Sequence, residues 1–89
     1  MTDTTRPTPD PAVAAYPVDD ELVLYDPRQG QGFVLNPTAA RIWSLCDGSR
    51  TVAAVAAELA AAYALGDEQA LSDVCACLED LRRAGLLRP

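Results

Sequence analysis

The apolar pattern of this chain changes its period at Asn36, and the change fixes the order of its secondary structure. Before this residue, segment 21–26 (ELVLYD) alternates, with Leu22 and Leu24 on one face and Val23 and Tyr25 on the other. After it, apolar residues recur at helical spacing in three successive segments. Strands followed by three helices predict an α+β domain that resembles a winged helix with its wing moved to the front.

The expected strands form a hairpin or a three-stranded meander. Segment 27–32 (PRQGQG) reads as the turn after ELVLYD, and 33–36 (FVLN) as the returning strand. Segment 12–16 (AVAAY) is a candidate edge strand whose pairing Pro17 would limit, so the presence of this strand stays open. Residues 1–11 alternate proline with polar residues and are expected to be a disordered tail, which leaves residues 12–89 as the domain.

Each helix has its own boundary signals. Asn36 is a good N-cap with Pro37 at the first helical position, and Asp47-Gly48 ends the first helix. Thr51 or Ser49 caps the second helix. Asp67 is expected to cap the third, which Gly85 ends before an apolar tail that packs back on the core.

The charge argues against nucleic acid and anionic membranes as partners. The formal net charge is −6, and all seven cations are arginine. In a helix-turn-helix reading the third helix would enter the DNA, yet its first two turns carry Glu68 and Asp73 and no cation. No segment approaches the roughly 18 apolar residues of a spanning helix, and the polar start MTDTTRPTPDP is not a signal peptide. We therefore expect a cytoplasmic protein.

The three cysteines are expected to be structural. Cys46 and Cys75 lie on apolar helix faces, with Cys77 at the edge of its stripe. Residues two apart on a helix point about 200° apart, so Cys75 and Cys77 are not spaced as a metal pair. We expect neither a metal nor a cofactor.

Nothing in the sequence predicts catalysis. The chain has no histidine, no Gly-rich phosphate loop and no nucleophile elbow. Asp19, Asp20 and Glu21 read as a solvated loop. Asp73 and Asp80 share an outer helix face at i and i+7, where a solvated face is the simplest interpretation and a catalytic pair or a docking patch are the alternatives.

The expected strand 33–36 presents an edge without protection. The sequence GFVL carries neither the charge nor the proline that commonly protects an exposed edge. Such an edge beside an apolar helix accepts an added peptide strand. The alternative is that the third helix or a second copy of the chain covers it, and the residues alone do not decide between the two.

The ordered motifs resemble the PqqD family, the small proteins named from pyrroloquinoline quinone biosynthesis. The resemblance covers about residues 22–88. It rests on a set of short motifs rather than on any one of them: Leu35-Asn36, Cys46-Asp47-Gly48, Thr51-Val52, Asp73-Val74 and Gly85-Leu86-Leu87.

This resemblance implies a non-catalytic recognition element for ribosomally made precursor peptides. Family members bind the leader segment as an extra strand on the third strand of the sheet, against the third helix, and present it to a modifying enzyme. Carried over, the peptide-binding residues would be Gly32, Phe33, Val34, Leu35, Leu71, Val74, Cys75 and Leu78.

The enzyme partner stays open at this point. Partners in the family include radical SAM enzymes, and similar domains serve the leader peptidases of lasso-peptide pathways. The alternative functions are a structural or dimerisation domain with a winged-helix-like fold, or an acidic helix-turn-helix regulator.

Overall fold

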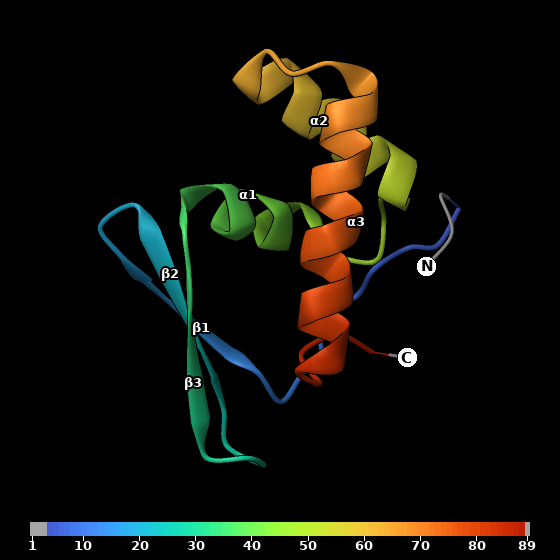
Figure 1. Ribbon diagram of the computed structural model, residues 1–89. Helices are drawn as coiled ribbons and strands as arrows, with labels where there is room; N and C mark the ends of the chain where they lie inside the picture. Colours follow the sequence, from blue (N-terminus) through green and yellow to red (C-terminus); the bar gives the residue numbers. More distant parts are fainter. Residues whose placement is uncertain (1–3, 89) are drawn as a thin grey trace.

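Three strands precede three helices in the computed structural model, which describes residues 4–88 (Figure 1). The helices lie on one side of the sheet, and α3 stands beside it. This confirms the α+β order expected from the change of period at Asn36. The bounds are β1 Ala14–Val18, β2 Glu21–Asp26, β3 Gln31–Leu35, α1 Pro37–Leu45, α2 Val52–Tyr63 and α3 Asp67–Arg83.

The sheet is an antiparallel meander in the order β1-β2-β3. Leu24 of β2 pairs with Ala15 of β1 and with Phe33 of β3. Segment 12–16 is therefore part of a real strand, although that strand starts two residues later and includes Pro17. A proline is tolerated there because β1 is an edge strand.

The alternation of β2 separates a core face from an outer face. Leu24 is fully buried beneath the helices, whereas Tyr25 is 41% exposed on the opposite face. Tyr16 and Val34 share that outer face and are 56% and 67% exposed. The helices thus cover only one side of the sheet.

Two of the three expected helix caps are confirmed. The Asn36 side chain accepts a hydrogen bond from the Ala39 N–H (2.8 Å), and Thr51 accepts one from the Ala54 N–H (3.1 Å). Asp67 is not the cap of α3: Gly66 occupies that position, and Asp67 is the first helical residue. Its carboxylate lies in the first turn, where the positive end of the helix dipole stabilises its negative charge.

The core joins the inner face of the sheet to all three helices. Its fully buried members come from each of these elements and from the tail after α3. Leu86 and Leu87 are 1% and 5% exposed, which confirms that the C-terminal segment packs back on the core. The central residues are Leu24, Ile42, Val52, Val55, Leu59, Val74, Leu78 and Leu86.

The N-terminal segment departs from the expected disorder within the described residues. The Val52 N–H donates to the Thr5 carbonyl (2.8 Å), and the Arg88 N–H donates to the Thr8 carbonyl (2.8 Å). The Asp10 N–H donates to the Leu86 carbonyl (3.0 Å). Prolines lack an N–H but keep the carbonyl, so this segment still pairs with other parts of the chain. Residues 1–3 of the expected tail lie outside the described residues.

A buried carboxylate anchors the turn between β2 and β3. Asp26 is fully buried at the end of the inward face of β2 and accepts hydrogen bonds from Arg28 Nε (3.0 Å) and Gln29 Nε2 (2.7 Å). Arg28 also donates to Asp10 (2.9 Å) and to the Gly85 carbonyl (3.1 Å). These bonds hold the turn against the end of α3, and they hold the pKa of Asp26 well below its usual range.

Candidate functional site

Strand β3 presents an open main-chain edge. It pairs with β2 on one side, and no Cα of β3 lies within 8 Å of a Cα of α3. A strand added to a sheet lies about 4.8 Å from its neighbour. Along its length, Gln31–Leu35, the strand has no proline and no charge. The β1 edge differs because Pro17 lacks an N–H, so β3 is the better template for an incoming strand.

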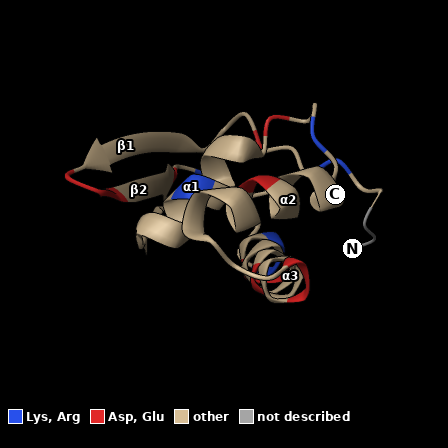
Figure 2. Ribbon diagram, turned by 90° about the horizontal axis from the view of Figure 1, so that it is seen from above, with Lys and Arg blue, Asp and Glu red and all other residues tan. Residues whose placement is uncertain are grey.

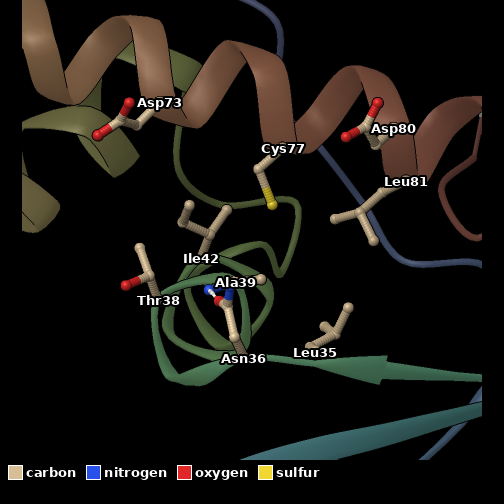
Figure 3. A pocket seen from close by; sticks show the side chains of 9 residues that line it. All are labelled: Leu35, Asn36, Thr38, Ala39, Ile42, Asp73, Cys77, Asp80 and Leu81. Atoms are coloured by element: carbon tan, nitrogen blue, oxygen red, sulfur yellow. Dashed lines mark hydrogen bonds between the residues drawn. The ribbon is translucent and has the colours of Figure 1, made fainter.

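A hollow of about 280 Å³ lies where β3, α1 and α3 meet (Figure 3). Leu35 at the end of β3 and Ile42 of α1 contribute apolar side chains to it, and Cys77 points toward Ile42 from α3. The Pro37 start and the Asn36 cap fix the position of α1 directly after β3. The remaining lining residues are Asn36, Thr38, Ala39, Asp73, Asp80 and Leu81.

Two aspartates make the lining of the hollow negatively charged. Asp73 and Asp80 lie on either side of Cys77 along α3 (Figure 3). Figure 2 shows α3 almost end-on, with acidic positions on its ribbon. No cationic side chain lines the hollow, and among residues 4–88 no ion pair joins either aspartate to an arginine. The nearby Arg82 and Arg83 both pair with Glu79.

Four residues of α3 were expected to contact the peptide beside β3, and none of them lines this hollow: Leu71, Val74, Cys75 and Leu78. Val74 and Leu78 are fully buried in the core, and Leu71 lines a separate hollow beside α2. Cys75 is half-buried and packs against the core. The four residues follow the most apolar face of α3, which packs on the core. The adjacent face of α3, which carries Asp73, Cys77 and Asp80, is the one that lines the hollow beside β3. Contact of the four expected residues with peptide stays an expectation from the family resemblance, and the full burial of Val74 and Leu78 argues against it for those two.

The cysteines near the site are protonated thiols at neutral pH. Burial raises the pKa of Cys46 to about 12. Burial, with a smaller contribution from Asp80, raises the pKa of Cys77 to about 11. A neutral thiol behaves as a small apolar group, so Cys77 extends the apolar floor of the hollow.

The described part of the chain contains no group of three or more metal-ligating side chains placed to hold an ion. No helix within residues 4–88 combines the length and the apolarity needed to cross a bilayer.

A family model matches the region that forms this site. The model describes coenzyme PQQ synthesis protein D (PqqD), and it matches residues 21–87, from the start of β2 to the apolar tail. The chain belongs to the PqqD family. Among curated PqqD relatives, a PqqA binding protein of Bradyrhizobium diazoefficiens is 45% identical over 49 residues, which are 55% of this chain. The match spans about half (48%) of that relative.

Two solved structures share the fold of this PqqD-family chain. One is TbiB1 in complex with the TbiA(beta) leader peptide, with a TM-score of 0.84 and 27% identity; the match covers 91% of this chain and 94% of that one. The other is a lasso peptide synthetase B1 complexed with the leader peptide, with a TM-score of 0.85 and 28% identity, covering 94% and 99%. Both proteins hold a leader peptide.

Sequence reasoning missed the buried role of Asp26, and it left open whether Asp73 and Asp80 form a solvated face, a catalytic pair or a docking patch. A signal existed for each. Asp26 continues the inward series of Leu22 and Leu24 at a spacing of two, so its carboxylate had to meet the core side. The i, i+7 spacing of Asp73 and Asp80 placed them on one face, but only the course of α3 relative to β3 shows what that face meets.

Proposed function

We propose that this protein binds the leader segment of a ribosomally made precursor peptide as a fourth strand on β3 and presents it to a modifying enzyme. The protein itself is not a catalyst in this proposal, because the chain lacks histidine and the hollow holds no nucleophile-base pair. A newly made precursor peptide is first available in the cytoplasm, so we propose that it meets this protein there. The acidic charge of the chain sets nucleic acid aside as a partner.

The observation that carries the proposal is the open β3 edge beside an apolar hollow. Main-chain pairing with residues 32–35 supplies affinity, and side chains of the added strand enter the hollow for specificity. The similarity to two proteins that hold leader peptides supports this assignment. We retain Gly32, Phe33, Val34 and Leu35 as the strand side of the site and propose Asp73, Cys77, Asp80 and Leu81 as its helix wall.

The enzyme remains one of two classes. Membership of the PqqD family supports a radical SAM enzyme like those of pyrroloquinoline quinone biosynthesis. The structural similarity to a lasso peptide synthetase B1 supports the leader peptidase of a lasso-peptide pathway. A radical SAM gene, or a peptidase gene with a cyclase gene, beside the gene for this chain distinguishes them.

Amide hydrogen exchange tests the binding mode. The probe is a synthetic leader segment of the precursor encoded beside this chain. We expect protection to rise at 32–35 and along 73–81, with little change over Val52–Tyr63. Protection confined to α2 would refute strand addition, and no binding at about 100 μM peptide would refute leader recognition.

A proline substitution tests the main-chain contact. Neighbouring residues of an antiparallel strand direct their N–H groups to opposite sides, so of Phe33→Pro and Val34→Pro one removes a bond to β2 and the other a bond to the added strand. We expect one variant to keep its circular dichroism spectrum and lose peptide binding. Val34→Thr is the matched control, since this side chain is 67% exposed on the outer face. Retained binding by both folded proline variants would exclude pairing at β3.

A further inference from the structure

The hollow beside β3 combines an apolar floor with two carboxylates at its rim. Leu35, Ile42 and the Cys77 thiol are the apolar part, and Asp73 and Asp80 are the charged part (Figure 3). An apolar side chain entering the hollow would pack on its apolar floor but would leave the two carboxylates without a cationic partner. A carboxylate entering here would meet like charge.

The two carboxylates keep their charge available for a partner. Glu79 on the same helix already pairs with Arg82 and Arg83, whereas Asp80 is exposed and has no arginine partner among the described residues. Asp73 is half-buried and accepts one hydrogen bond from the neutral Gln69 amide (2.8 Å).

The spacing of the wall suits an extended peptide. Seven residues of helix separate Asp73 from Asp80 by about 10 Å along α3. Side chains on one face of a strand recur about every 7 Å. Two consecutive same-face side chains of an added strand therefore fit within the wall, one over the floor and one at the rim.

We propose that the hollow selects a peptide carrying Lys or Arg two residues from an apolar side chain, both on the face turned to α3. This inference rests on the proposed function and names the chemistry of its peptide. The apolar side chain packs on Ile42 and Cys77, and the cation meets Asp73 or Asp80. The aliphatic stem of the cation covers more of the floor while its head stays at the rim.

Fluorescence polarisation with the neighbouring leader segment tests this charge preference. Each Lys or Arg of the peptide is replaced by Gln in turn, against wild type, Asp73→Asn and Asp80→Asn. We expect one replacement to weaken binding to wild type about three- to tenfold, and to have less effect on the Asn variant that removes its partner. Added salt should weaken the parent peptide more than the replaced one.

Asp20→Asn is the matched control, because it makes the same charge change at an exposed position in the turn between β1 and β2. It should leave affinity unchanged. A leader that binds wild type equally well with all its cations replaced overturns the inference and leaves the proposed function standing. A leader that does not bind wild type at all refutes the proposed function itself.

Discussion

Replacing Leu78 by alanine should reduce stability and leave peptide affinity intact. Leu78 projects from α3 into the core and is fully buried there, although the family resemblance implied that it contacts peptide. Removing a buried leucine side chain to the β-carbon costs about 3 kcal/mol of unfolding free energy, from lost burial and from the cavity left behind. For a domain of this size the loss corresponds to a fall in Tm of about 12–24 °C.

The size of this effect leaves a measurable folded protein. A chain of 89 residues has about 4–13 kcal/mol of stability, so the variant stays mostly folded at 25 °C. Thermal and urea denaturation followed by circular dichroism give the stability change, and fluorescence polarisation gives the affinity of the folded fraction. We expect affinity within about twofold of wild type, because Leu78 does not line the hollow.

Leu71→Ala is the matched control for this experiment. It is the same chemical change on the same helix, but Leu71 is only half-buried and lies on the flank toward α2. Its cost should be about 1 kcal/mol. Equal costs for the two variants would contradict the burial of α3, and a tenfold loss of affinity in folded Leu78→Ala would return Leu78 to the peptide site.

Three further predictions concern stability and thiol chemistry. The lowered pKa of Asp26 means that its stabilising contribution is complete above the ordinary carboxyl pKa and is lost as pH falls below about 4; acid unfolding of Asp26→Asn should be less pH-dependent than that of wild type, and equal slopes would argue against this role. Gly48→Ala should cost about 1–2 kcal/mol in urea denaturation, because Gly48 has a φ of 84° and an added Cβ would meet Thr8 Oγ1 at 2.9 Å; an unchanged midpoint would show that the turn relaxes freely. Cys46 and Cys77 should react slowly with a thiol reagent at pH 8 until the chain is unfolded, since burial raises their pKa values; rapid reaction of all three cysteines in native protein would contradict it.

Local signals predicted most of the fold because they act within a few residues. The Asn36-Pro37 pair sets the start of α1 by a hydrogen bond three residues away, and the alternation of β2 sets its two faces. The Asp67 cap failed because the sequence offers both Gly66 and Asp67 at the start of α3, one residue apart, and an acidic first turn looks similar in either register.

The site was less predictable because it depends on how distant elements approach each other. The strand half follows from the unprotected sequence of β3. To predict the helix half, one must know which face of α3 turns toward β3. The packing of Val74 and Leu78 in the core determines that face. Similarly, residues 5–10 gain their order from partners more than 40 positions away, which no local pattern reports.

The pairing of the two end segments has a consequence for how this domain can be joined to other proteins. Pro9 and Leu87 form an isolated bridge. Both marked ends of the chain lie on the side of α3 away from the sheet (Figure 1). A flexible linker attached at either end therefore leaves from the side opposite β3. A fused enzyme would hold the recognition domain at high effective concentration while the peptide edge stayed clear of the tether.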